Sequence, residues 1–222
     1  MDSFLNQSTY EKFKRDILSF GLKPGETVSA AKIAERYSVS RTPAREALVK
    51  LETEGLVEII PQSKSIISKI DLSLAKQEWF IRYSLETAMT DDFFANVNQA
   101  DINEMKKYNK EMCRLSNSEK TQDNCYFYQL NDNAFHSVVY RVSNQNLASN
   151  VINCTMAHYS RLRFLTDIED SYRDRTVEGH EKLIKLIEKK DIEGYKESLN
   201  LHLHYILYDI SDLEKMYPDY FA

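Results

Sequence analysis

The order of elements at the start of the chain is the feature that most constrains its fold. Residues 56–60 and 65–70 are rich in β-branched side chains and flank the polar break Pro61-Gln62, a pattern typical of a β-hairpin. From Asp71 onward the sequence shows no strand pattern of any length. We therefore expect a mostly α fold whose hairpin lies near the N-terminus.

Three short helical patterns precede this hairpin. An apolar stripe of helical period begins at Tyr10 and ends at Gly21. Ser29 can cap a second helix and Ser40 a third. Pro43 is tolerated in the third helix because the backbone amides of a first turn have no helical partners. Three helices followed by a hairpin is the order of a winged helix-turn-helix.

The rest of the chain shows helical periodicity throughout. A first helix is expected from Asp71 or Ser73 to Met89, and further patterns cover roughly residues 100–115, 123–143, 145–165, 172–189 and 192–209. We expect a winged helix-turn-helix over residues 1–70 and an all-helical bundle of about six helices over residues 71–222. The bundle is the candidate domain for effector binding and dimerisation.

Charge is divided unevenly between these two parts. Residues 1–70 hold 11 Lys and Arg against 9 Asp and Glu, while residues 71–222 hold 18 against 25, within a net charge of −5. The first part is therefore the one suited to phosphate contacts. The three cysteines form no CxxC pair, and there is neither a signal peptide nor a long apolar run. We expect a cytoplasmic protein that does not enter a membrane.

The start of the third helix carries the chemistry for reading DNA. Arg41 and Arg45 are four residues apart and project from one helix face, where their paired donors suit guanine or phosphate oxygens. Ser40, Thr42 and the free amides of the first turn can bind phosphate oxygens. An isolated pair of arginines would more often be a solvated face, but its place in a winged-helix pattern favours DNA.

Three motifs strengthen this interpretation. They are Leu-Lys-Pro-Gly-Glu from Leu22, Ala-Glu-Arg-Tyr-Ser-Val-Ser-Arg-Thr-Pro-Ala-Arg-Glu-Ala-Leu from Ala34, and Leu-Glu-Thr-Glu-Gly-Leu-Val from Leu51. Together they resemble the DNA-binding domain of GntR-family regulators over roughly residues 8–70. The resemblance implies that Arg41 and Arg45 contact DNA.

The expected wing departs from that family. GntR wings usually carry Arg-Gly after Pro-Gln, whereas this chain has Ser63-Lys64. Glycine at that place would allow close approach to the minor groove. Lys64 is a candidate for phosphate contact instead, so this wing is expected to read DNA in its own way.

Four polar residues in the helical part form a candidate metal site. Asp132 and His136 are four residues apart on a helix that faces a core, and His180 and His202 lie on two later helices. Imidazole nitrogens with a carboxylate oxygen suit a divalent transition metal, zinc or nickel first and manganese as a further candidate. Spacing alone leaves open that each is an ordinary core or surface residue.

A second resemblance concerns these same residues. The stretches Asp-Asn-Asn-Ala-Phe-His from Asp132, Glu-Gly-His-Glu-Lys-Leu-Ile from Glu178, and His202-Leu203 look like the FCD domain of FadR-type GntR regulators, over about residues 75–210. The resemblance implies that one Asp and three His hold a metal in an effector pocket, completed by a carboxylate ligand or water. His158 has no counterpart there and is expected to be structural.

One arginine is a candidate for effector binding. Arg82 matches an arginine of the first effector-domain helix in that family and could clamp a carboxylate bidentately. It is equally open that Arg82 is exposed or pairs with Glu86 one turn later. Arg161 and Arg163 are weaker candidates for the same role.

The features together predict a regulator and not an enzyme. We expect a repressor that binds palindromic operator DNA as a homodimer and responds to a small carboxylate effector. One alternative is a metal-dependent hydrolase, because a metal ion with an open coordination position can activate water for catalysis. Another is a regulator whose metal is purely structural. The DNA-binding domain favours sensing over turnover.

Overall fold

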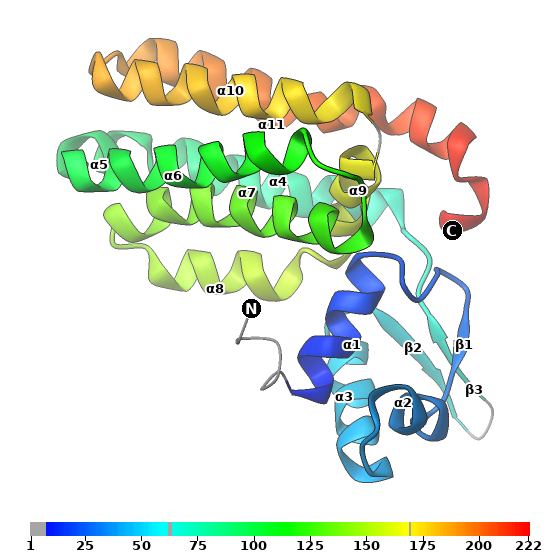
Figure 1. The fold of residues 1–222 in the computed structure, drawn as a ribbon. Coiled ribbons are helices and arrows are strands. Elements are labelled where there is room, and N and C mark those ends of the chain that lie inside the picture. The colour runs from blue at the N-terminus through cyan, green and yellow to red at the C-terminus, as the bar shows by residue number, and fades with distance from the viewer. Residues whose placement is uncertain (1–7, 62–63, 169) are drawn as a thin grey trace.

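A computed structural model describes residues 8–61, 64–168 and 170–222 of the chain. It consists of a small winged helix at the N-terminus and a larger bundle of helices. Figure 1 shows the winged helix at the bottom and the bundle at the top. The predicted mostly α fold is confirmed. The exact domain boundary after residue 70 stays a prediction.

The winged helix contains the three predicted helices and the hairpin. These are α1 (Thr9–Leu18), α2 (Ala30–Tyr37), α3 (Arg41–Thr53), β2 (Val57–Ile60) and β3 (Lys64–Ile67). A further strand, β1 (Thr27–Val28), pairs antiparallel with β3 and gives the sheet order β1-β3-β2. Two residues are too few to show strand periodicity, so the sequence did not indicate β1.

Local sequence explains where these helices begin. Ser8 and Glu11 form a capping box at α1, and the Ser29 hydroxyl accepts a hydrogen bond from the backbone amide of Lys32 at α2. The hydroxyl of Ser40 makes no such bond at α3, so it stays available to an outside partner. The apolar faces of the three helices meet the sheet in a core that includes Phe13, Ile17, Ile33, Leu48, Leu51, Leu56 and Ile67.

The bundle has eight α-helices among the described residues, and the expected number of about six was too low. They are α4 (Leu72–Ala88), α5 (Thr90–Asn96), α6 (Gln99–Ser116), α7 (Gln122–Val142), α8 (Asn146–Thr155), α9 (Ala157–Ile168), α10 (Asp170–Glu188) and α11 (Ile192–Met216). In Figure 1, α10 and α11 lie on the side away from the winged helix, while α9 packs against α1 of the winged helix. No described helix is long and apolar enough to cross a membrane.

The largest departure from the predicted helices is the break between α8 and α9. The sequence predicts one helix over residues 145–165, but the chain breaks at Met156. The backbone amides of His158 and Tyr159 donate to the Glu78 carboxylate, at 2.9 and 2.7 Å. In a continuous helix they would donate to carbonyl oxygens of the preceding turn. Glu78 lies on α4, and a periodicity pattern cannot reveal a partner so remote in sequence.

Helix α9 joins the bundle to the winged helix. Its Ala157 packs in the winged-helix core. The fully buried guanidinium of Arg161 donates to the carbonyl oxygens of Ser68 at 2.5 Å and Lys69 at 3.4 Å, just after β3. Ser68 in turn donates its hydroxyl to the carbonyl oxygen of Gly55, at 2.6 Å, where α3 has just ended.

His158 holds the segment between the two parts. Its Nδ1 accepts a hydrogen bond from the Asp71 amide at 2.9 Å. Burial and the neighbouring Arg161 lower the pKa of His158 to about 4, so its ring is a neutral acceptor at pH 7. This contact agrees with the structural role expected from the sequence.

Replacing Arg161 by methionine should destabilise the protein by about 2–4 kcal/mol, because the part-buried hydrogen bonds to the carbonyl oxygens of Ser68 and Lys69 would be lost. Urea denaturation followed by the fluorescence of Trp79 measures the change. Arg114→Met, at an exposed ion pair on α6, is the control and should leave the midpoint almost unchanged. Equal midpoints for the two variants would show that the Arg161 contacts do not stabilise the native state.

Candidate metal centre and nucleic-acid interface

The structure brings all four predicted metal ligands together. Asp132 and His136 lie one turn apart on α7, while His180 comes from α10 and His202 from α11. One ligand atom of each lies within 4.8 Å of those of the others. The Nε2 atom of His136 is 3.2 Å from that of His180 and 3.3 Å from that of His202.

These separations fit a shared ion. Two nitrogens bound at about 2.0–2.1 Å in a tetrahedral arrangement lie about 3.3 Å apart. The Asp132 carboxylate is also in range, because its Oδ1 is 3.5 Å from the Nε2 of His180. The donor set of one carboxylate oxygen and three imidazole nitrogens suits zinc or nickel.

A carboxylate fixes the orientation of His136. Glu86 Oε2 is 2.7 Å from its Nδ1, which therefore carries the proton and leaves Nε2 free to bind an ion. The buried Glu86 also accepts from the Nε of Arg82 at 2.8 Å and from the hydroxyl of Tyr140 at 3.2 Å. Although burial opposes it, His136 and Arg82 lower the pKa of Glu86 to about 2, so the carboxylate is ionised.

The two other histidines are held as neutral rings. Burial and the nearby His202 lower the pKa of His180 well below its ordinary value. Burial and His136 lower the pKa of His202 to about 3. Neutral imidazole is the form that binds metal, so no proton must be removed from either ring at pH 7.

Backbone at Gly179 makes room for this arrangement. A Cβ atom at Gly179 would lie 2.7 Å from the Nδ1 of His202, closer than side chains approach one another. The Nδ1 atoms of His180 and His202 are buried and have no hydrogen-bond partner among the described residues, so packing and whatever the Nε2 atoms bind hold these rings in place. The residues present therefore fit a metal ion.

Arg82 is buried and pairs with Glu86, one of the alternatives that the sequence left open. Its Nη2 is also 3.5 Å from Asp132, which Arg163 of α9 contacts more closely. Burial alone would raise the pKa of Asp132, but Arg163 and the neighbouring histidines hold it well below its usual range. Of the two weaker sequence candidates, Arg163 lies at the cluster, whereas Arg161 points to the winged helix.

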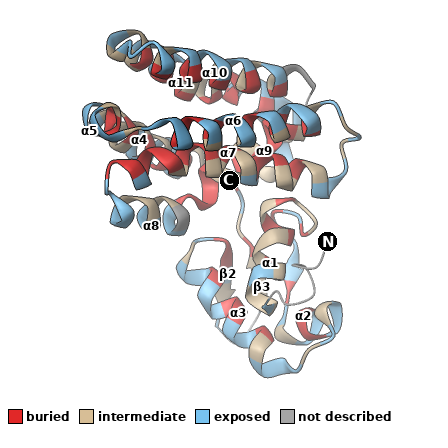
Figure 2. Ribbon diagram, turned by 60° about the vertical axis from the view of Figure 1, so that its left-hand side comes forward, coloured by how far each residue is buried: buried red, intermediate tan, exposed pale blue. Residues whose placement is uncertain are grey.

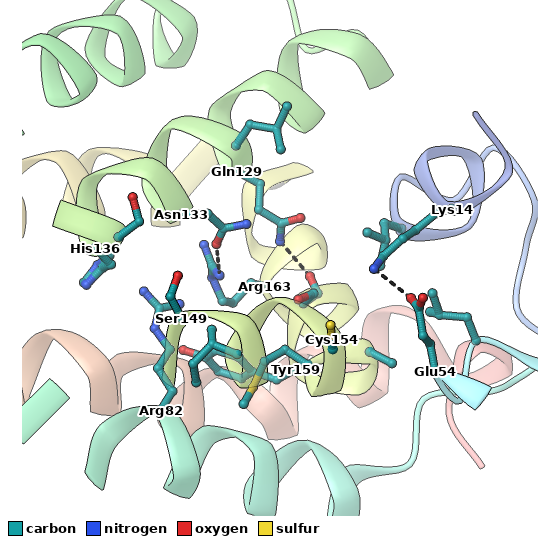
Figure 3. Close-up of a pocket in the computed structure, with 18 of the residues that line it drawn as sticks. Lys14, Glu54, Arg82, Gln129, Asn133, His136, Ser149, Cys154, Tyr159 and Arg163 are labelled. Atoms are coloured by element: carbon teal, nitrogen blue, oxygen red, sulfur yellow. Dashed lines mark hydrogen bonds and ion pairs between the residues drawn. The ribbon is translucent and has the colours of Figure 1, made fainter. Parts of the chain in front are cut away.

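A cavity of about 290 Å³ opens beside this cluster. Its lining includes Arg82, His136, Tyr159 and Arg163 in the bundle, and its far end is formed by winged-helix residues such as Glu54. Figure 3 shows the Arg82 and His136 side chains at one end of this space and Lys14 and Glu54 at the other. The side chains that can meet a carboxylate therefore border a space large enough for a ligand.

The predicted DNA-contacting residues lie at the surface. Those at the start of α3 are all exposed: Ser40, Arg41, Thr42 and Arg45. In Figure 2, α3 is pale blue where it is exposed and red where it faces the core. Within the described part of the chain, neither arginine has an ion pair that would hold it away from a ligand. Lys64 is exposed at the first position of β3, and Ser63 lies outside the described residues.

Sequence reasoning missed two residues that shape the centre. The sequence indicates Glu86 only as a partner of Arg82, because its bond to His136 depends on a contact between α4 and α7. Gly179 stands out in the sequence only as part of the Glu-Gly-His motif. A glycine inside a helical pattern is costly and usually has a packing reason, so it was the signal that could have pointed to a close neighbour.

A winged helix joined to a helical domain with a His/Asp pocket defines a class: transcription regulators with an effector-binding domain. The gntR family of bacterial regulatory proteins matches residues 5–67, and the FCD domain matches residues 79–205. The chain belongs to the gntR family and carries an FCD domain, as the sequence motifs indicated. It is a DNA-binding transcriptional regulator.

Similar proteins agree with this membership. The HTH-type transcriptional repressor RspR of Escherichia coli (strain K12) is 26% identical over 218 residues, 98% of this chain and 94% of that protein. The gluconate operon transcriptional repressor of Bacillus licheniformis is 26% identical over 205 residues, 89% of this chain and 81% of that protein. The solved structure of E. coli McbR/YncC shares the fold, with a TM-score of 0.75 at 18% identity over 94% of this chain and 96% of that one.

Gly179→Ala should weaken zinc binding by about tenfold to a hundredfold, because the added Cβ would displace the His202 ring. The helix itself favours the change, since alanine is a better helix former by up to about 1 kcal/mol. Calorimetric titration with zinc measures the affinity. Glu178→Ala, at the exposed neighbouring position, is the control and should bind zinc as the wild type does. Unchanged binding by Gly179→Ala would remove His202 from the ligand set.

Proposed function

We propose that this protein is a repressor whose affinity for operator DNA is controlled by a small carboxylate effector bound at a metal-containing pocket. The observation that carries the proposal is the cluster of Asp132, His136, His180 and His202 beside a cavity that Arg82 also lines. A divalent ion held there would supply a Lewis-acidic site for a carboxylate oxygen. Zinc or nickel suits these ligands best, and manganese is a further candidate.

Arg82 is the proposed clamp for the effector. Its Nε is engaged by Glu86, while its outer nitrogens lie near Asp132 and border the cavity. Arg163 borders the same space and offers a second guanidinium. Guanidinium groups bind carboxylates through paired hydrogen bonds, which supports an acid as the ligand. Relatives named as gluconate operon repressors support the same ligand chemistry.

DNA is bound in this proposal by two copies of the winged helix. Arg41 and Arg45 read base edges, and Ser40, Thr42 and Lys64 contact phosphates. A homodimer would place two α3 helices about one turn of DNA apart on a palindromic operator. In support, α4 exposes the large apolar side chains of Phe80 and Ile81, which a second copy could cover. Relatives named as repressors support repression over activation.

The site is less well suited to the alternative of a hydrolase. Metal-dependent hydrolysis needs a general base whose pKa lies near 7, and Glu86, the carboxylate bonded to His136, does not fit that role because its pKa is lowered to about 2. Turnover assays on esters and lactones test this alternative directly. A purely structural metal would change thermal stability but leave DNA affinity unaltered.

Arg41→Ala and Arg45→Ala should each weaken operator binding by about 1–3 kcal/mol and relax specificity at one position in each half-site, because a bidentate base contact is lost. Fluorescence anisotropy with labelled operator measures affinity and should give two chains per palindrome. Arg114→Ala, on the exposed face of α6, is the control. Unchanged affinity in both α3 variants would exclude this helix as the reading element.

Arg82→Lys should weaken the effector response and leave the metal content unchanged, because lysine keeps the charge beside Glu86 but loses the bidentate geometry. His136→Ala and His202→Ala should reduce both the effector response and the metal content. Chelation of the metal should lower the melting temperature of the wild type. Plasma mass spectrometry and DNA binding with and without ligand are the measurements. A wild-type protein that cannot be loaded with zinc, nickel or manganese would refute the metal-containing pocket.

A further inference from the structure

The cavity beside the histidine cluster is bordered by both parts of the protein. In the bundle its lining comes from α4, α7, α8 and α9, and in the winged helix it comes from α1 and from residues 54–56. Lys14 and Glu54 lie at the winged-helix end, opposite Arg82 and His136 (Figure 3). A ligand that fills this space therefore contacts both parts at once.

The cavity is too large for a simple acid alone. A molecule the size of water takes about 30 Å³ of volume, and acetate is only a few times larger. Acetate bound between Arg82 and His136 would leave most of the roughly 290 Å³ to water. The cavity can therefore hold a longer ligand that displaces this water.

The lining of the cavity is mixed, and its far end carries charge. Apolar side chains come from both parts: Leu18, Leu56, Leu130, Ile152 and Met156. The polar side chains of Gln129, Asn133 and Ser149 line the same space (Figure 3). The far end has two carboxylates, Glu11 and Glu54, and one cation, Lys14. Lys14 Nζ is 2.7 Å from Glu54 Oε2, and the Tyr10 hydroxyl donates to Glu54 as well. The lining of this end therefore has one more carboxylate than it has cations and suits a hydrogen-bond donor, while Lys50 lies outside the lining, over the Tyr10 ring.

We propose that the effector is an extended acid that reaches from the bundle into the winged helix. Its carboxylate lies at Arg82 and His136, its chain follows the apolar and polar side chains of the cavity, and a terminal amino or hydroxyl group donates to Glu54. The inference rests on the proposed function for the carboxylate end alone. The far end and the contact with the winged helix are additional.

This placement gives the ligand direct control over α3. Glu54 is the C-cap of α3, while Arg41 is the first residue of the same helix. A ligand that contacts Glu54 and α1 favours one position of the winged helix relative to the bundle. A ligand shifts the equilibrium between two positions of the winged helix only if it binds one of them more tightly than the other. Short acids lack the contact with Glu54, so they should occupy the pocket without changing the affinity for DNA.

Cysteine labelling can report occupancy of the far end. Cys154 lines the cavity and is exposed. It also lies near Tyr10, since burial, Glu54 and, to a smaller extent, this thiol raise the pKa of that tyrosine. Cys113 is exposed on α6 outside this cavity and serves as an internal standard, while Cys125 is buried.

The probes are straight-chain acids from acetate to octanoate, with their ω-amino, ω-hydroxy and ω-carboxy derivatives, added to zinc-loaded full-length protein. At about ten times its Kd, a long ω-amino or ω-hydroxy acid should slow iodoacetamide labelling of Cys154 about tenfold and leave Cys113 unaffected. Acetate should compete for Arg82 without protecting Cys154. Dicarboxylates should bind more weakly than amino acids of equal length, because Glu11 and Glu54 repel them.

Glu54→Gln tests the proposed donor contact. It should reduce the affinity for the ω-amino acid about tenfold, by loss of a charge-assisted hydrogen bond, and leave acetate binding unchanged. Glu52→Gln, exposed on the same helix, is the matched control and should alter neither.

The outcomes separate the two proposals. If acetate binds through Arg82 but no longer acid protects Cys154, the effector stays within the bundle and this inference is wrong, while the proposed function stands. Equal affinity for dicarboxylates and amino acids would likewise overturn it. If no acid binds to the zinc-loaded protein, the proposed function fails and the inference fails with it.

Discussion

The relation between the two parts of this protein depends on the buried guanidinium of Arg161. A charge at that depth is tolerated only where hydrogen bonds replace water, and here the carbonyl oxygens of Ser68 and Lys69 do so. Residues two apart on a helix point in nearly opposite directions, so Arg163 on the same helix projects into the cavity beside the histidine cluster instead. Helix α9 therefore connects the pocket with the end of β3, and a movement of this helix acts on both.

The charges at the histidine cluster impose a second constraint. Two arginines, Arg82 and Arg163, are balanced by the carboxylates of Glu86 and Asp132, while burial keeps His180 and His202 neutral. A divalent ion would make this buried group of charges net positive, and an anionic ligand would reduce the excess. Binding of metal and of carboxylate should thus support one another, and the coupling free energy must be the same in both directions.

The sequence predicted what depends on local pattern and on motif. The three helices and hairpin of the winged helix were indicated by periodicity and turn residues, and Asp132, His136, His180 and His202 were found from spacing and a family resemblance. Features that depend on contacts remote in sequence were not predictable. The break at Met156 needs Glu78 of α4, the orientation of His136 needs Glu86, and the burial of Arg161 needs the winged helix docked beside α9.

The length of α3 shows why contacts at its far end can govern DNA binding. Thirteen helical residues span about 20 Å, so the end at Glu54 borders the cavity while the end at Arg41 is free to enter a groove. In a dimer the two free ends must match half-sites about 34 Å apart, and a rigid helix transmits a small tilt at one end to the other. Packed interfaces favour discrete positions over gradual ones. Regulation requires that a ligand bind one arrangement of the winged helix and the bundle more tightly than another. A ligand in a cavity that both parts border would meet this requirement.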